Sequence, residues 1–288
     1  MANKVYEYVT QNIINQLEEG TIPWQKPWKE GVPINYITRK PYRGINLFLL
    51  PKSGEYLTFK QVQSLGGKVK KGSKAHMIVF WKISQYEKEK VLSNGESKIE
   101  EVSIPILRYY KVFHLSDVEG ISTKLDTFEH TPIEAAENIV NGYNEVPIFN
   151  REDSAYYSPS GDYINLPCKE KFEEIEEYYS TAFHEITHST GHKSRLDRFD
   201  TNSTIFGSET YSFEELVAEL GASMLCGVAG IEQMTIRNSA AYIKSWLKKL
   251  KDDDTLIIRA SSKAQKACDY ILKAAGISVE EDFSEEVA

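Results

Sequence analysis

The sequence has few cysteines and lacks any long apolar run. Its three cysteines, Cys168, Cys226 and Cys268, are odd in number, widely separated and without a C-x-x-C pair, which excludes a disulfide framework and a cysteine zinc site. No stretch approaches the roughly 18 apolar residues of a membrane-spanning helix, and Glu7 lies where a signal peptide requires an uninterrupted apolar core. We therefore expect a cytoplasmic protein that does not engage a membrane.

Positive charge is scarce in the second part of the chain. The first 120 residues hold 18 Lys/Arg against 12 Asp/Glu, whereas the remaining 168 hold 16 against 30, and the net charge is -8. A basic part joined to an acidic part indicates a polyanion-binding module beside a second module. The competing explanation is that small domains often differ by a few charges. With 41% hydrophobic residues, the chain has enough apolar material for two domains of ordinary size.

The most informative motif is His184-Glu185-Ile186-Thr187-His188, which matches the H-E-x-x-H zinc pattern. Residues four apart share a helix face, so both histidines can bind one tetrahedral ion, with Glu185 as the general base toward water at the metal. Zn²⁺ is therefore the expected cofactor, and a zinc-dependent metallopeptidase is the candidate activity. The same pattern arises by chance in about one chain of this composition in a hundred.

A zinc site needs a third protein ligand, for which Glu215 is the better candidate. It lies 27 residues after His188 on the next predicted helix, and Glu219 follows one turn later, where an acidic residue can orient a ligating histidine. Burying both carboxylates on a helix face rich in Leu and Ala would be costly without a cation or partner. A competing role stays open for Glu215, because Ser212 and Glu215 also match a helix capping box.

His192 is the other candidate for the third ligand. It follows His188 by four residues, but Gly191 breaks the helix before it. A metzincin-type motif would need histidine at position 194, where the chain has Ser194. We expect His192 to lie at the rim of the cleft or to have a structural role.

Aromatic and basic side chains alternate repeatedly in the first part of the chain, an arrangement in which rings stack on unpaired bases and cations meet phosphates. Each stretch also has an ordinary explanation. The tryptophans can fill the core, and strand aromatics are more often core or cross-strand pairs. The lysine loop, which we define as Lys68, Lys70, Lys71 and Lys74 around Gly72, can be a solvated turn. The lysine loop also lacks the residue order of a nucleotide P-loop. The candidate DNA contacts are Trp24, Trp28, Arg43, Asn46, Lys60, Lys68, Lys70, Lys71, Arg108 and Tyr110.

Apolar periodicity, capping residues and turn signals predict the remaining elements. Helices are expected over residues 4–19, 131–143, 171–190, 213–225, 237–250 and 256–275, with a short helix after Thr58. Strands 76–86 and 99–114 are expected to form one hairpin, and a second is expected around residues 159–162. The result is an α+β protein with a basic part over 1–120, a linker over 121–130, a mainly helical part with a small sheet over 131–278, and an acidic tail over 279–288.

The chain resembles the ArdC family of antirestriction proteins, which are carried by conjugative plasmids and other mobile elements. The matching segments are Gly20–Trp24 with Pro27–Trp28, Tyr42–Asn46, Thr58–Gln61, Gly66–Gly72 and Arg108–Phe113 in the first part, and Ala182–His192 and Glu214–Glu219 in the second. The resemblance implies a single-stranded-DNA-binding domain over 1–120, of a kind also fused to some plasmid primases. A zincin-like metallopeptidase domain would then occupy 131–278.

The resemblance further implies a protein that binds DNA entering a new host as single strands and protects it from restriction. Two alternatives stay open. The first is an active zinc metalloprotease that cleaves a DNA-bound or host-defence protein, and the second is a non-catalytic, zinc-stabilised inhibitor of restriction proteins. Single-stranded DNA is thus the first expected partner, and host restriction or other DNA-bound proteins are further candidates.

Overall fold

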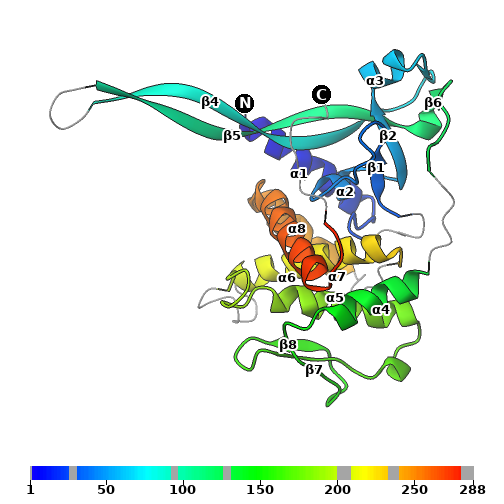
Figure 1. Ribbon diagram of the computed structural model, residues 1–288, viewed down its shortest axis with the longest axis vertical. Coiled ribbons are helices and arrows are strands. Elements are labelled where there is room, and N and C mark those ends of the chain that lie inside the picture. The colour runs from blue at the N-terminus through cyan, green and yellow to red at the C-terminus, as the bar shows by residue number, and fades with distance from the viewer. Residues whose placement is uncertain are drawn as a thin grey trace.

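The computed structural model describes residues 2–25, 31–91, 97–125, 131–199, 209–232 and 240–279. The predicted combination of helices and sheets is confirmed (Figure 1). The helices are α1 (Ala2–Glu18), α2 (Asn46–Leu49), α3 (Phe59–Ser64), α4 (Pro132–Gly142), α5 (Ile175–Ser189), α6 (Glu209–Ala229), α7 (Ala240–Asp252) and α8 (Leu256–Ala274). The strands are β1 (Pro33–Asn35), β2 (Gly54–Thr58), β3 (Lys68–Val69), β4 (His76–Val91), β5 (Ser97–His114), β6 (Val118–Glu119), β7 (Ile148–Phe149), β8 (Tyr156–Ser158) and β9 (Tyr163–Asn165).

The predicted helices form, although two of them have shifted ends. α5 begins at Ile175 rather than near residue 171, because Lys169–Lys171 forms a separate 3-10 turn. α6 extends beyond the predicted 213–225 in both directions and ends just before Gly230, whose φ of 71° is the left-handed conformation that terminates many helices. Among the described helices, none combines the length and apolar composition needed to cross a membrane.

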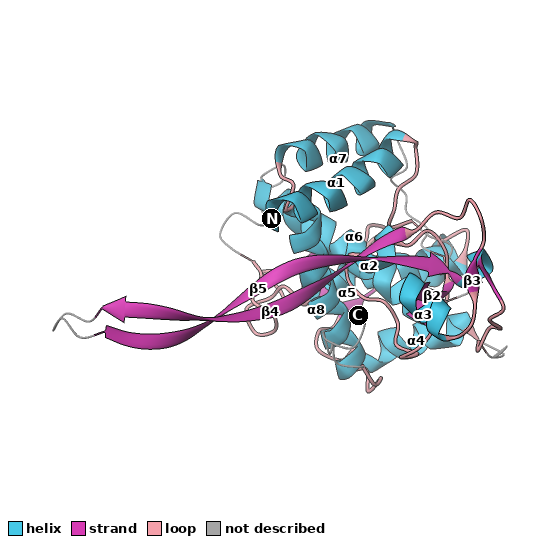
Figure 2. Cartoon of the chain, turned by 90° about the horizontal axis from the view of Figure 1, so that it is seen from above, coloured by secondary structure: helices cyan, strands magenta, loops and turns pink. Residues whose placement is uncertain are grey.

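A four-stranded sheet in the order β1-β2-β5-β4 organises the amino-terminal part. β1 pairs in parallel with β2, and β5 pairs antiparallel with both β2 and β4. The β4–β5 hairpin contains the two predicted strands but is longer than predicted, and it extends as an arm beyond the rest of the molecule (Figures 1 and 2). The turn predicted between these strands lies outside the described residues.

The short helix predicted after Thr58 is α3. The Thr58 hydroxyl accepts a hydrogen bond from the Gln61 backbone N–H, and the Gln61 side chain accepts one from the Thr58 backbone N–H, which is a capping box. After the helix the chain turns at Gly66, with a φ of 74°, and enters β3, which pairs antiparallel with β6. The lysine loop therefore follows directly from a well-defined turn.

Three helices form the centre of the carboxyl-terminal part, where α6 packs against both α5 and α8. A Cβ at Gly221 of α6 would come within 2.5 Å of Thr187 Cγ2 on α5, so the two helices approach more closely than any side chain at position 221 would allow. This close approach brings α6 against the helix that carries the H-E-x-x-H motif. The predicted small sheet is β7-β9-β8, and its strand β8 contacts α5.

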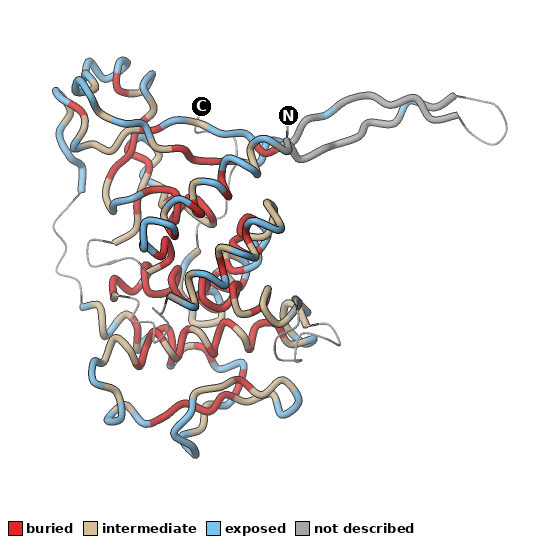
Figure 3. The backbone as a smooth tube through the Cα atoms, turned by 180° about the vertical axis from the view of Figure 1, so that it is seen from behind, coloured by how far each residue is buried: buried red, intermediate tan, exposed pale blue. Residues whose placement is uncertain are grey.

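The two parts of the molecule share one hydrophobic core (Figure 3). α1 lies against α7, as Figure 2 shows. The same buried cluster contains Ile13 and Phe48 from the amino-terminal part and Phe183 and Leu220 from the carboxyl-terminal part. The division into two domains by a linker at 121–130 therefore stays a prediction, because one buried cluster contains side chains from both sides of the linker.

The first residues of the predicted linker are attached to the amino-terminal part. The buried carboxylate of Glu55 accepts hydrogen bonds from the Thr123 hydroxyl at 2.7 Å and from the Lys124 backbone N–H, and it pairs with Arg39. The remaining linker residues, 126–130, and tail residues 280–288 lie outside the described residues.

Candidate metal centre

Two adjacent helices bring the three predicted metal ligands together. His184 and His188 lie one turn apart on α5, Glu215 lies on α6, and one donor atom from each is within 4.8 Å of the others. The two histidine Nε2 atoms are 3.1 Å apart, and the carboxylate oxygens of Glu215 lie 3.8 Å from His184 Nε2 and 3.5 Å from His188 Nε2. Donors that bind one tetrahedral zinc ion with bonds of about 2.0–2.1 Å are about 3.3 Å apart, so this set fits such an ion.

The charges at the site favour a bound cation. Burial raises the pKa of Glu215, but contacts with His188, His184 and Tyr211 outweigh it and lower the pKa to about 2. Burial lowers the pKa of His188, but hydrogen bonds to Glu214 and Glu215 outweigh it and raise the pKa to about 10. Glu215 is therefore anionic, and a divalent metal that binds here must displace a proton from His188.

Glu214 supports His188 from the side opposite the ligand cluster. Its Oε1 lies 3.5 Å from His188 Nδ1, while His188 Nε2 faces Glu215. Arg198 donates from Nε and Nη2 to the Glu214 carboxylate, at 3.1 and 2.6 Å. Its Nη1 donates to Thr190 Oγ1 at 2.6 Å. A carboxylate on the second nitrogen of a ligating imidazole fixes its tautomer and orientation.

Sequence reasoning missed Glu214, because it placed the supporting carboxylate at Glu219. The sequence signal for this role was the pair of adjacent glutamates, Glu214 and Glu215. Side chains at adjacent helix positions point in different directions, so the two carboxylates can contact different nitrogens of one histidine on the facing helix. Glu219 is buried and accepts a hydrogen bond from the Tyr242 hydroxyl, and its predicted role toward a ligating histidine stays a prediction. Glu185 is 8% exposed, and its charge contributes to the raised pKa of His188, so it lies beside the ligands.

We expect Arg198→Ala to weaken zinc binding by about 10–100-fold, the usual effect of losing an outer hydrogen-bond partner of a ligand. The buried Glu214 carboxylate would lose its cation, take up a proton and stop orienting His188. Competition with a fluorescent chelator measures the affinity. Arg259→Ala, which removes the exposed ion pair with Asp253, is the matched control. Unchanged affinity in Arg198→Ala would contradict the supporting role.

The capping-box alternative for Glu215 is excluded by the position of the helix. α6 begins at Glu209, so Ser212 lies inside the helix and cannot be its N-cap. The Glu215 carboxylate instead accepts a hydrogen bond from the Tyr211 hydroxyl and faces the two histidines. Its side chain is thus available for a metal.

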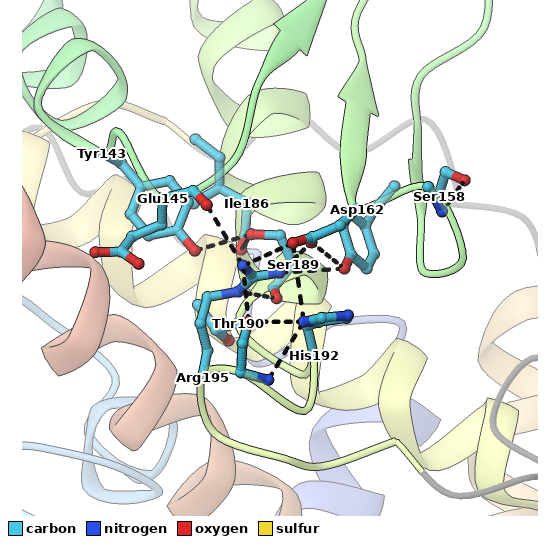
Figure 4. A network of polar contacts seen from close by, with 12 residues as sticks. Tyr143, Glu145, Ser158, Asp162, Ile186, Ser189, Thr190, His192 and Arg195 are labelled. Carbon is cyan, nitrogen blue, oxygen red and sulfur yellow. Dashed lines mark hydrogen bonds and ion pairs between the residues drawn. The ribbon is translucent and has the colours of Figure 1, made fainter.

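His192 belongs to a separate polar network, drawn in Figure 4. Its Nδ1 is 2.7 Å from Ser194 Oγ and 3.8 Å from Asp162 Oδ2 in the turn between β8 and β9. Arg195 pairs with Asp162 through both terminal nitrogens and donates from Nε to the Ser189 carbonyl at 2.7 Å. These hydrogen bonds and ion pairs connect the β8–β9 hairpin to the carboxyl end of α5, directly after the H-E-x-x-H motif.

Two of the predicted DNA contacts are buried in the core. Trp24 has no exposed surface and packs edge-to-face against Trp246, with ring centroids 6.2 Å apart. The Asn46 side chain exchanges two hydrogen bonds with the backbone of Val79, at 2.8 and 2.7 Å. Trp24 cannot contact DNA in this conformation, whereas Asn46 retains 5% exposure. The Trp24 prediction is therefore corrected to a structural role, in line with the core explanation that the sequence left open for the tryptophans. The Asn46 contact stays a prediction.

The other DNA candidates lie in mixed surroundings. Arg43 is partly exposed, and its Nη2 pairs with both carboxylate oxygens of Asp269 on α8, at 2.6 and 2.5 Å. Tyr110 is half-buried against Phe80. Trp28 lies outside the described residues. The exposed candidates, which stay predictions, are Lys60 on α3, Lys68 on β3, Lys70 and Lys71 in the following turn, and Arg108 on β5.

Comparisons with known proteins match both parts of the chain. Residues 3–113 match the family model of the N-terminal domain of anti-restriction factor ArdC, and residues 134–263 match that of a zincin-like metallopeptidase. The chain is 35% identical over 288 residues to DNA primase TraC of Escherichia coli, with 93% of this chain aligned. It spans 27% of that TraC and 20% of another. It is also 32% identical to the uncharacterized protein y4eC of Sinorhizobium fredii, covering 93% of this chain and 91% of y4eC.

Two solved structures of the antirestriction protein ArdC from plasmid R388 have the same architecture. The metal-free structure superposes with a TM-score of 0.72 at 37% identity, covering 94% of this chain and 97% of that one. The Mn(II)-bound structure superposes with a TM-score of 0.73 at 36% identity over the same shares. Since both family models match and the structural likeness runs almost from end to end, the chain belongs to the ArdC family of antirestriction proteins.

Proposed function

We propose that this antirestriction protein binds single-stranded DNA, protects incoming DNA from host restriction, and holds Zn²⁺ through His184, His188 and Glu215. The observation that carries the metal part is the convergence of His184, His188 and Glu215, of which one donor atom each lies within 4.8 Å of the others. The plasmid-borne relative supports the antirestriction role, and its Mn(II)-bound structure supports a divalent metal in this family. Imidazole nitrogens and a single carboxylate are a ligand set that suits zinc.

The surroundings of the ligands also suit hydrolysis of a peptide bond. When bound, the metal would supply Lewis-acid chemistry and lower the pKa of a coordinated water. Glu185 lies beside the ligands, where its carboxylate can accept a proton. β8 is an edge strand of its sheet and contacts α5, so an extended polypeptide could pair with it next to Glu185. An active metalloprotease is therefore the second candidate function, and a non-catalytic inhibitor of restriction proteins is the alternative if hydrolysis fails.

Binding to a labelled oligothymidylate tests the DNA part of the proposal. We expect the affinity to fall with rising salt, because lysines that neutralise phosphates release counterions, with a slope of about -0.7 per phosphate contact on a single strand. Lys68→Glu with Lys71→Glu, at two exposed positions of the lysine loop, should lower the affinity, whereas Lys244→Glu on α7 should not. Equal affinity for single-stranded and duplex DNA at moderate salt would contradict the proposal.

A further inference from the structure

A cavity of about 800 Å³ lies between the two parts of the molecule. One wall consists of residues 42–46 with parts of β4 and β5, and the other consists of α8 with residues 276–279. The volume falls within the roughly 300–1,000 Å³ typical of sites that enclose a small ligand. The cavity is separate from the metal cluster, since none of the three metal ligands lines it.

The lining of the cavity has an excess of positive charge. Lys40 and Arg43 come from the amino-terminal part, Lys266 and Lys273 come from α8, and the single acidic residue, Asp269, is paired with Arg43. Among the described residues, Lys266 and Lys273 have no ion-pair partner. An anionic ligand would therefore neutralise charges that the described residues leave uncompensated.

A buried donor in the same lining also lacks an acceptor. Arg43 Nε is inaccessible to solvent and makes no hydrogen bond with any described residue, although Arg43 Nη2 is paired with Asp269. A buried N–H group without an acceptor is energetically unfavourable. An anionic oxygen in the cavity could accept this hydrogen bond after the Arg43 side chain turns its Nε toward the cavity, because solvent does not reach this group in the structure.

Exposed aromatic rings lie beside the cavity on one face of the β4–β5 hairpin and on the adjacent α1. Trp81 lines the cavity and is 41% exposed. Tyr109 is 54% exposed and pairs with Val79, two residues from Trp81, so Tyr109 and Trp81 share one face of the hairpin. Tyr8 of α1 stacks on Tyr109 and is itself 62% exposed. Rings held in this way at the surface are suited to stacking on unpaired bases.

We propose that the cavity holds nucleotides of a single DNA strand, with phosphate oxygens at Arg43, Lys266 and Lys273 and a base against Trp81. The proposal rests on the proposed single-stranded DNA binding and names the site where it occurs. We expect a single strand rather than a duplex, because stacking on Trp81 requires an unpaired base. The strand therefore contacts α8 of the carboxyl-terminal part as well as the amino-terminal part, and binding requires both.

Fluorescence anisotropy of a labelled oligothymidylate, with the full-length chain, tests this site. We expect Lys266→Glu combined with Lys273→Glu to weaken binding at least about tenfold, since two phosphate contacts change sign. Lys263→Glu, an exposed position on the same helix outside the cavity, is the matched control and should be close to wild type. Trp81→Ala should weaken binding by about fivefold or more through loss of stacking. Unfolding temperatures check that the variants remain folded.

The outcomes separate this site from DNA binding in general. If the lysine-loop variant weakens binding while the α8 variant and Trp81→Ala do not, the protein binds single strands elsewhere and the cavity proposal is overturned. If the wild-type protein does not bind the oligonucleotide at all, the proposed function fails as well.

Discussion

On the metalloprotease proposal, we expect a Glu185→Gln variant to keep its metal and to lose peptide hydrolysis by about 10²–10⁴-fold, the usual contribution of a general base. The amide has nearly the same shape as the carboxylate but cannot accept a proton at neutral pH. Glu185 is buried beside the ligands rather than among them, so the metal should be retained. Cleavage of an internally quenched peptide library by the zinc-loaded protein measures the activity, and mass spectrometry under native conditions measures the metal.

Glu176→Gln provides the control for this experiment. It lies on the same helix in the first turn, two turns before His184, and is outside the cluster of metal ligands. Its activity and metal content should match those of the wild type. Equal cleavage by Glu185→Gln and wild type would contradict the general-base role. If the zinc-loaded wild type cleaves nothing in the library, the metalloprotease alternative loses its support and the non-catalytic alternative gains it.

Trp24→Ala is expected to lower the free energy of unfolding by about 3–5 kcal/mol, as for other fully buried large side chains. Trp24 connects the two parts of the molecule: its ring contacts Trp246, and its Nε1 donates to the Tyr242 hydroxyl at 3.4 Å. The Ser223 hydroxyl donates to the Trp24 carbonyl at 2.6 Å, so α6 holds the same segment. Urea denaturation followed by circular dichroism measures the change.

The same variant distinguishes a structural tryptophan from a DNA contact. Under conditions in which Trp24→Ala is fully folded, its affinity for oligothymidylate should equal that of the wild type, because Trp24 has no exposed surface. Tyr8→Ala is the matched control for stability, since Tyr8 is 62% exposed and should change the free energy of unfolding little. A large loss of DNA affinity in Trp24→Ala, with unchanged stability, would contradict the burial.

The metal ligands could be predicted from the sequence because their signals are local. The spacing of His184 and His188 places both on one helix face. Glu215 and Glu219 have the same four-residue spacing on the next helix. Glu214 and Arg198 were not predictable in the same way. Their roles depend on how closely α6 approaches α5 at Gly221 and on the loop that returns Arg198 to that junction, and both are properties of packing.

For the predicted DNA contacts, the sequence pattern does not decide whether a side chain faces solvent or the core. A tryptophan between prolines and lysines has the same sequence pattern whether it faces solvent or core, and only the position of α7 decides that Trp24 is covered. Arg43 likewise meets Asp269 of α8, more than 200 residues later in the chain. The cavity between the two parts was not predictable, since its walls come from segments that the sequence assigns to different domains.

The zinc content of purified wild-type and Glu215→Ala protein shows whether His184, His188 and Glu215 hold one metal ion. Mass spectrometry of metals should find one zinc per wild-type chain after dialysis against trace zinc, and well under half of that in Glu215→Ala at the same protein concentration. Glu170→Ala, at an exposed position before α5, should bind like wild type. Full zinc occupancy in Glu215→Ala, or no metal in the wild type, would contradict the account.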